Sequence, residues 1–149
     1  MKYAHNISFR VFSKPEDNFD LVKKGLINFV GLDDDQLKKA NFEVQETTGL
    51  DGEKIYVLSL ELVKNKQVND FLEKLKNNLS EEDIDYLLSR RKPDDQANFY
   101  LRFDKSLLKK NVLKITESGD CYHVKVSVAA FPSNSVNALK VIKQIFINE

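Results

Sequence analysis

Alternating apolar and polar residues predict a β-strand near the start of the chain. In "HNISFRVFS", Ile7, Phe9 and Val11 fall on one side, whereas Ser8 and Arg10 fall on the other. Successive side chains of a strand point to opposite faces of a sheet, so this pattern indicates one buried face and one exposed face. The strand should therefore lie at the boundary between a core and an open surface.

Four later stretches carry apolar residues at the spacing of a helix, three to four positions apart. The first should start at "SKPE", where Ser13 and Glu16 resemble a capping box, and should end at Gly31. The other three helices are expected at residues 66–78, from the N-cap Ser80 to the residues before Pro93, and from an N-cap at Ser133 or Asn134 to Phe146.

The remaining periodic stretches predict strands. Residues 41–63 should form two strands joined through Gly49 and Gly52, which is typical of a hairpin. Three further strands are expected at residues 98–104, 112–116 and 121–131. The order β-α-β-β-α-α-β-β-β-α favours an α+β fold, a two-layer sandwich in which helices pack on one face of an antiparallel-rich sheet. The length of 149 residues fits a single domain over residues 1–149.

The same alternation assigns residues to the open face of the predicted sheet. These are Ser8, Arg10, Tyr100, Arg102, Asp104, His123, Lys125 and Ser127. This face combines basic, aromatic and hydroxyl side chains.

Charge is balanced overall but unevenly distributed. The chain has 23 basic and 23 acidic residues, a formal net charge of zero that does not suggest a nucleic-acid-binding protein. Residues 90–110, however, carry seven basic side chains against three acidic ones, whereas residues 31–53 carry two against seven. Electrostatic binding would therefore depend on one stretch of the chain.

Motifs for catalysis are absent from the sequence. It contains no phosphate-binding loop, no dinucleotide fingerprint, no nucleophile elbow and no helical zinc pair, so we expect no enzyme and no cofactor. Cys121 and His123, with His5, could be metal ligands, but three ligands without a second close pair favour a buried cysteine and a partly exposed histidine. Consecutive acids at residues 33–35 could hold magnesium in a nuclease, although such acids more often cap or decorate an exposed segment.

Sequence features of export are absent as well. Cys121 is the single cysteine, so an internal disulfide is impossible, and the first twelve residues lack the apolar core of a signal peptide. No stretch is long and apolar enough to cross a membrane. We expect a cytoplasmic protein with no membrane contact.

The basic residues around the strand at residues 98–104 suggest a polyanion-binding surface. Lysines near a strand end often form only a solvated, aggregation-resistant surface, and Arg102 could pair with a carboxylate instead. Tyr100 lies beside Arg102, with Phe12 as a possible neighbour on the same face, and an aromatic ring can stack an unpaired base while cations hold its phosphates. The candidate residues are Arg10, Lys14, Tyr100, Arg102, Lys105, Lys109, Lys110 and Lys125.

Three segments, "AHNISFRVFSKPED", "FYLRFDKSLL" and "HVKVSVAAFPSN", resemble an archaeal family of small RNA-binding domains described as predicted exosome-associated proteins. That family is similar in fold to the ribosomal large-subunit protein that binds 5S RNA. The most specific match is Arg102, Asp104 and Lys105, followed by His5, Arg10 and Lys14. The family usually continues with a glutamine and then a glycine, whereas this chain has "SLLKKN" with Asn111, a residue type that tolerates the left-handed conformation of a turn.

The resemblance implies RNA binding without catalysis and an association with RNA-processing machinery such as the exosome. We therefore expect a noncatalytic RNA-binding protein. The alternative is a protein-interaction or self-association module, such as a homodimer, that docks through the open sheet face without direct RNA contact.

Overall fold

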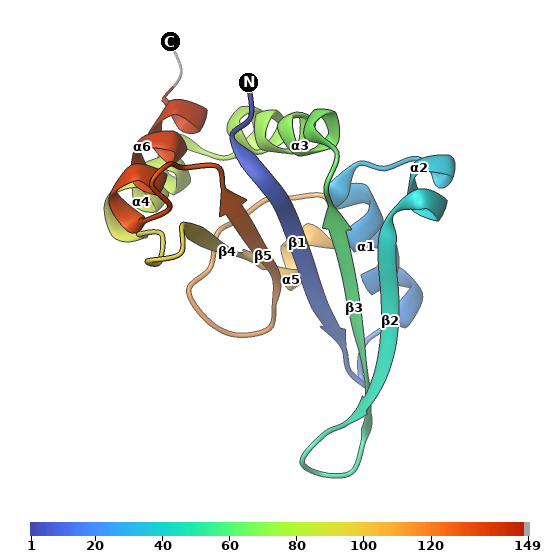
Figure 1. Ribbon diagram of the computed structural model, residues 1–149. Helices are drawn as coiled ribbons and strands as arrows, with labels where there is room; N and C mark the ends of the chain where they lie inside the picture. The colour runs from blue at the N-terminus through green and yellow to red at the C-terminus, as the bar shows by residue number, and fades with distance from the viewer. Residues whose placement is uncertain (148–149) are drawn as a thin grey trace. The chain divides into compact units, whose positions relative to one another are not determined.

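The computed structural model describes residues 1–147, in which five strands and six helices follow one another in the order β-α-α-β-β-α-α-β-α-β-α. The strands form one open antiparallel sheet in the order β2-β3-β1-β5-β4 (Figure 1), and helices pack on it, so the α+β class is confirmed. The strands are β1 (Ala4–Ser13), β2 (Asn41–Thr48), β3 (Lys54–Leu62), β4 (Asn98–Asp104) and β5 (Cys121–Val128). The helices are α1 (Phe19–Val30), α2 (Asp34–Lys39), α3 (Asn65–Asn78), α4 (Glu81–Arg90), α5 (Lys105–Leu108) and α6 (Ser135–Phe146).

Contacts divide the chain into two compact units. Unit 1 comprises Met1–Ile7, Leu62–Leu101 and the described residues from Lys125 onward, and unit 2 comprises Ser8–Glu61 and Arg102–Val124. Strands β1, β4 and β5 therefore supply several residues to each unit, and β3 supplies its last residue, Leu62, to unit 1. Each unit has its own apolar core.

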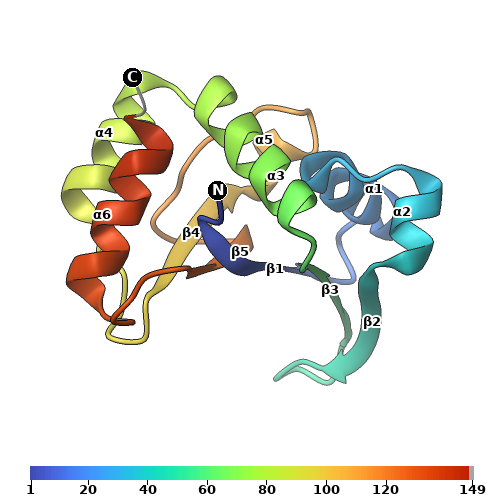
Figure 2. The same cartoon turned by 45° about the horizontal axis from the view of Figure 1, so that its top comes forward.

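In unit 1, α6 packs against both α3 and α4, and the three helices lie on one side of the unit's strands (Figure 2). Their apolar faces include Val68 and Leu75 of α3, Leu87 of α4 and Ile142 of α6, all of which are buried. The predicted helices have the expected caps here: Ser80 accepts a hydrogen bond from the N–H of Asp83, and Asn134 accepts one from the N–H of Asn137.

In unit 2, α1 covers one face of the strands. The ring of Phe29 in α1 lies edge-on to Phe9 of β1, with centroids 5.8 Å apart, and to Phe103 of β4, with centroids 4.9 Å apart. Strands β2 and β3 form the predicted antiparallel hairpin, in which Asn41 pairs with Glu61. No helix within residues 8–61 and 102–124 lies on the opposite face of the strands (Figure 2).

Helix α1 begins later than the sequence suggests. Ser13 is the last residue of β1 and is buried, so the capping box predicted at Ser13 and Glu16 is wrong. A turn follows, in which Lys14 donates its backbone N–H to the carboxylate of Asp17, and Asn18 caps the helix. Asn18 and Ser13 are both good capping types, and local pattern alone did not distinguish them.

The chain after β4 also differs from the prediction. Asp104 accepts a hydrogen bond from the N–H of Leu107, so the chain turns directly into the short helix α5. The predicted strand at residues 112–116 is instead an isolated bridge between Phe103 and Ile115, because it follows a turn and meets β4 only briefly. The sheet of the described residues therefore has five strands rather than the six expected.

Helix α2 was not expected either. Asp33 accepts a hydrogen bond from the N–H of Gln36, and the Gln36 side chain accepts one from the N–H of Asp33, which is a complete capping box. The first of the three consecutive acids thus caps a helix.

Candidate functional site

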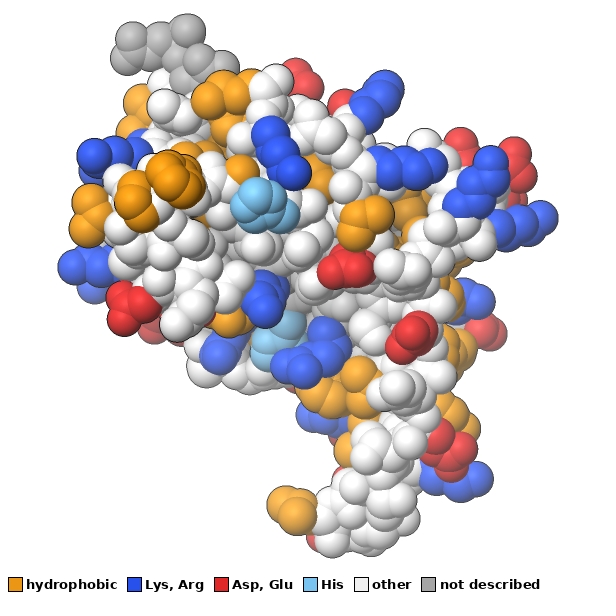
Figure 3. Space-filling model, in the orientation of Figure 1, with side chains coloured by type: hydrophobic (Ala, Val, Ile, Leu, Met, Phe, Trp, Pro, Cys, Tyr) orange, Lys and Arg blue, Asp and Glu red, His pale blue; other side chains and the backbone are white. Residues whose placement is uncertain are grey.

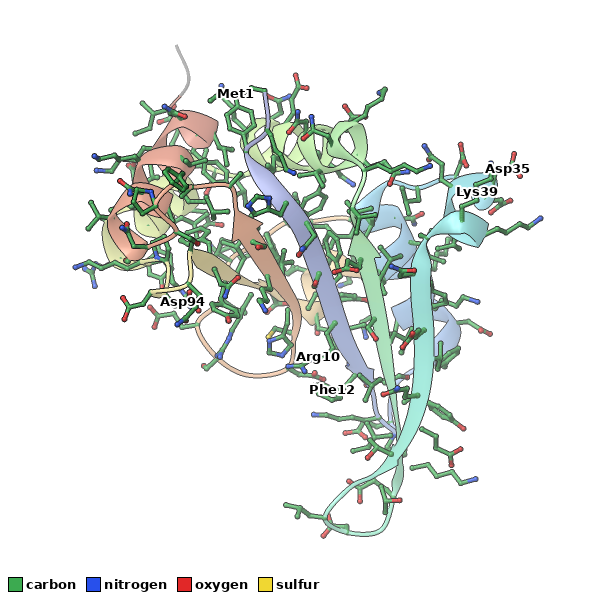
Figure 4. The ribbon with its side chains drawn as sticks, in the orientation of Figure 1. Met1, Arg10, Phe12, Asp35, Lys39 and Asp94 are labelled. Atoms are coloured by element: carbon green, nitrogen blue, oxygen red, sulfur yellow. The ribbon has the colours of Figure 1, made fainter. Side chains whose placement is uncertain are left out.

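An arginine and an aromatic ring lie together on the helix-free face of β1 in unit 2. The guanidinium carbon of Arg10 is 5.6 Å from the centroid of the Phe12 ring, which is within the range of a cation–π contact (Figure 4). Alternation along β1 places both side chains on this face, since the neighbouring Phe9 and Val11 are buried on the other. Arg10 itself is exposed.

His123 of β5 extends this pair. Its ring is edge-on to Phe12, with centroids 6.4 Å apart and an interplanar angle of 88°. Arg102 of β4 lies near enough for its charge to act on His123, and its Nη1 donates to the carbonyl oxygen of Glu117 at 2.9 Å. We call Arg10, Phe12, Arg102 and His123 the arginine–aromatic surface.

Partial burial and the nearby positive charges favour the neutral form of His123. Partial burial lowers the pKa of His123, and the charges of Arg10 and Arg102 lower it further, whereas Asp120 acts in the opposite direction. A neutral, flat imidazole between two arginines can stack on an unpaired base, while the guanidinium groups remain available for phosphate oxygens.

Lys105 is not placed as a phosphate-binding lysine. Its side chain is only 3% exposed, and its Nζ donates to the carbonyl oxygen of Phe12, to Asp17 Oδ2 at 2.7 Å and to Asp120 Oδ2 at 3.0 Å. An ammonium group has three donors, and all three are used inside unit 2. The expectation that Lys105 contacts RNA therefore does not fit its position, because the turn into α5 directs it inward.

The Lys105 network holds the loop after β1. Burial opposes ionisation of Asp17, but hydrogen bonds from Lys105 and from the backbone N–H of Lys14, together with the charge of Lys105, keep the Asp17 pKa below its usual value. Lys14 lies 3.6 Å from Asp120 and is 41% exposed. Lys14 is thus positioned at the surface by the same carboxylates that bind Lys105.

Lys109 and Lys110 follow α5 on the surface of unit 2. Lys109 is half-buried and close enough to Asp17 for its charge to lower the pKa of that carboxyl group, and Lys110 is exposed. Asn111 adopts a φ of 63°, so the left-handed turn expected at this residue is confirmed. The two lysines are carried by this turn.

Tyr100 and Lys125 belong to unit 1. Tyr100 is 45% exposed, and its hydroxyl group donates to Asp94 Oδ2 at 3.4 Å. Hydrogen bonds from the backbone N–H of Asn98 and other neighbours hold the pKa of Asp94 below its usual value. Lys125 is exposed on β5, on the face predicted from alternation.

Sequence reasoning placed His123 on the open face and Phe12 as a possible neighbour of Tyr100 and Arg102 on that face, and it assigned stacking to Tyr100. It missed the edge-on pairing of Phe12 with His123, and it gave no role to Asp17 and Asp120. Phe12 is an aromatic residue on the otherwise polar face of β1, and this pattern could have indicated its pairing with His123. No local pattern could have revealed the second, because Phe12 and Asp17 are 93 and 88 residues from Lys105 in the sequence, and Asp120 is 15 residues away.

Basic and acidic side chains occupy different parts of the helix-free face of unit 2. Basic side chains lie beside a histidine over β1 and β5, whereas acidic ones lie over β2 and β3 (Figure 3). Cys121 Sγ is 3.6 Å from His123 Nε2, but residues 1–147 contain no group of three or more potential metal ligands. Within the same residues, no helix is long and apolar enough to cross a membrane.

Comparison with known proteins gives the family. A model of an RNA-binding family matches residues 6–128. An RNA-binding protein of Pyrococcus abyssi is 33% identical over 143 residues, which cover 95% of this chain and 92% of the relative. A solved DUF54 protein from Methanothermobacter thermautotrophicus is 26% identical with a TM-score of 0.80, covering 97% of this chain and 99% of that one. A DUF54 structure from Archaeoglobus fulgidus, 18% identical over 95% of this chain and 99% of its own, shares the fold with a TM-score of 0.78. The chain belongs to the RNA-binding family.

Proposed function

We propose that unit 2 binds single-stranded RNA through the arginine–aromatic surface, without catalysis. The observation that supports this most is the edge-on pair of Phe12 and His123 flanked by two arginines, on a strand face that no helix of the unit covers. Unpaired bases stack on such rings, and single-stranded RNA is the form of RNA whose bases are accessible.

The expected energetics follow from the two kinds of contact. Stacking of a base on an aromatic side chain contributes about 1–3 kcal/mol and tolerates any base. Phosphate contacts by arginine and lysine release counterions, so the affinity should fall steeply as salt is added. The overall charge of zero implies that this local surface, rather than the whole molecule, attracts RNA.

The remaining basic candidates have different proposed roles. Lys14, Lys109 and Lys110 are proposed to contact phosphates, and Lys105 holds the loop that carries Lys14. Tyr100 and Lys125 would provide RNA contacts of unit 1, which separate substitutions can test.

The cellular role proposed for the protein is that of an accessory of RNA processing in the cytoplasm, associated with the exosome or with ribosome-related machinery. Co-purification of exosome subunits that persists after ribonuclease treatment would support a direct association. We further propose that residues 1–149, of which 148–149 lie outside the described part, act as one RNA-binding domain. A single calorimetric unfolding transition is expected.

The test of RNA binding is fluorescence anisotropy with labelled single-stranded and duplex RNA at two salt concentrations. We expect the double variant Arg10→Ala, Arg102→Ala to bind single strands at least tenfold more weakly, since each charge-assisted hydrogen bond contributes about 1.5–3 kcal/mol. The matched control is Lys38→Ala, Lys39→Ala, which removes the same charge from the last turn of α2. Equal loss in both variants would indicate nonspecific attraction and contradict the proposed site.

A second copy of the chain or a protein partner could instead dock on this face, because the net charge of zero does not favour a polyanion. Sedimentation velocity distinguishes the cases. A homodimer that is disrupted by Phe12→Ala, with no RNA bound at low salt, would favour docking.

A further inference from the structure

A polar hollow lies on the same face of unit 2 as the arginine–aromatic surface. It has a volume of about 420 Å³ and is lined by Ser8, Asn41, Glu43, Ser59 and Glu61, with Phe9 and Leu60 completing its wall. Ser8 lies two residues before Arg10 on β1, so both side chains point to one face of the strand. The hollow therefore begins about 7 Å along β1 from Arg10.

Strand register brings the lining residues together. In the β2–β3 hairpin, Asn41 is directly opposite Glu61, and Glu43 is directly opposite Ser59. Directly opposed residues of a sheet project from the same face, and Asn41 and Glu43 are two apart on one strand. Asn41 Nδ2 lies 3.4 Å from Glu61 Oε1, a weak hydrogen bond that links one pair.

The chemistry of the hollow excludes the RNA backbone. Two carboxylates at its wall repel phosphate, so whatever enters must present hydrogen-bond donors. Within residues 1–147, no ion pair joins Glu43 to a lysine or arginine, and both of its oxygens remain available as acceptors. In an RNA strand, the donor-rich groups are base edges and ribose hydroxyls.

Among the four RNA bases, only guanine presents two adjacent donors on its Watson–Crick edge, at N1 and at the 2-amino group. Uracil has one N–H between two carbonyl acceptors, and adenine and cytosine each place an acceptor beside their amino group. The two oxygens of one carboxylate match the guanine pair and would face an acceptor on any other base.

We propose that this hollow is a guanine-binding pocket, in which Glu43 accepts hydrogen bonds from N1–H and the 2-amino group of an unpaired guanine. Asn41, two residues away on the same face of β2, donates its amide to guanine O6. The proposal rests on the proposed RNA binding and adds a base preference to it: Arg10 and the aromatic pair hold the neighbouring nucleotide, while the hollow reads the guanine.

The test uses labelled oligouridine strands that carry one central guanine, inosine, adenine or uridine. Inosine keeps N1–H and O6 but lacks the 2-amino group, so it removes one of the two donors. Fluorescence anisotropy should show the guanine strand binding about tenfold more tightly than the uridine strand, with inosine between them, because a bidentate base contact typically discriminates by about this factor or more.

Two substitutions that each remove one negative charge distinguish recognition of the base from general electrostatic effects. Glu43→Gln presents a donor beside its remaining acceptor, and we expect the guanine preference to fall below about twofold. Glu46→Gln is the matched control, since Glu46 is exposed on the same strand but points to the opposite face from Glu43. Thermal melting would confirm that both variants remain folded.

The outcomes distinguish the pocket from the function on which it rests. Loss of the guanine preference in Glu43→Gln but not in Glu46→Gln supports the pocket. Equal binding of all four strands by the wild type, or a preserved preference in Glu43→Gln, overturns the pocket and leaves RNA binding intact. Failure of every strand to bind at low salt overturns both.

Discussion

Removing the buried ammonium of Lys105 is the most informative test of the structure that supports the surface. In Lys105→Met the apolar stem is kept, but Asp17, Asp120 and the carbonyl oxygen of Phe12 each lose a hydrogen bond. Breaking a buried ion pair from one side leaves an uncompensated charge and typically costs about 3–5 kcal/mol.

The structure places the expected loss at the lower end of that range. Asp17 is only 12% exposed, so its carboxylate cannot readily regain water. Asp120 is 35% exposed and remains 3.6 Å from Lys14, so solvent and a second cation offset most of its loss. We expect Lys105→Met to lower the free energy of unfolding by about 3 kcal/mol.

Urea unfolding at neutral pH measures this loss, and a double-mutant cycle attributes it. Asp17→Asn removes the carboxylate charge that Lys105→Met leaves unpaired. The Asp17→Asn substitution should therefore lower the free energy of unfolding much less in Lys105→Met than in the wild type, with a coupling energy of roughly 1–3 kcal/mol. Lys110→Met is the control, because Lys110 is exposed near the end of α5 and should change stability by less than about 0.5 kcal/mol. A loss below about 1 kcal/mol in Lys105→Met, or additive costs in the cycle, would refute the reasoning.

Three further predictions concern unit 2. Gly25→Ala should lower the free energy of unfolding by about 1–3 kcal/mol in urea titrations, because the added Cβ would lie 2.5 Å from the buried Tyr122 hydroxyl oxygen. Asp17 has a folded-state pKa below its usual 3.8, so its contribution to stability is present above that pH and lost as the pH falls through the folded value; acid unfolding of Asp17→Asn should be less steep. His123 has a pKa below 6.5 in the folded protein, so folding stability should decline as the pH falls below 6.5, whereas RNA affinity should rise as phosphate stabilises the charged ring; anisotropy at pH 7.5 and 5.5 should show this rise in His5→Gln but not in His123→Gln.

The spacing of apolar residues was sufficient to predict most of the strands and helices. Burial alternates from Ile7 to Ser13 in β1 and from Tyr122 to Val128 in β5, as the sequence pattern predicts. Helices α3, α4 and α6 carry apolar stripes, and a side chain caps the N-terminus of α4 and of α6. The errors fall where short-range chemistry overrides pattern. At Asp104 a side-chain cap starts the short helix α5 directly after a strand, and at Asp33 a capping box creates α2 from a stretch with no buried residue.

The candidate site was predictable only as far as side-chain direction. Alternation placed Arg10, Arg102 and His123 on the helix-free face, and their burial agrees with that assignment. Whether a cation is available depends on partners that are distant in the sequence. Lys105 and Lys110 are both lysines and lie five residues apart in the sequence. Lys105 is 3% exposed and bonded to two carboxylates, whereas Lys110 is exposed.

The placement of the acidic residues in the hollow could not be predicted from the sequence either. An acidic stretch was evident at residues 31–53, but only the hairpin register places Glu43 opposite Ser59, with Ser8 also lining the hollow. Acidic residues at the proposed RNA-binding face are consistent with recognition of bases rather than with phosphate contact.

The measurement that tests the central claim most directly is NMR chemical-shift mapping of the labelled protein during titration with a short single-stranded RNA. The proposed site predicts that the amide signals of residues 8–14, 102 and 121–124 shift together, and that high salt reverses these shifts. Shifts confined to α2 or to the tip of the β2–β3 hairpin, with the signals of Phe12 and His123 unchanged at saturating RNA, would contradict it.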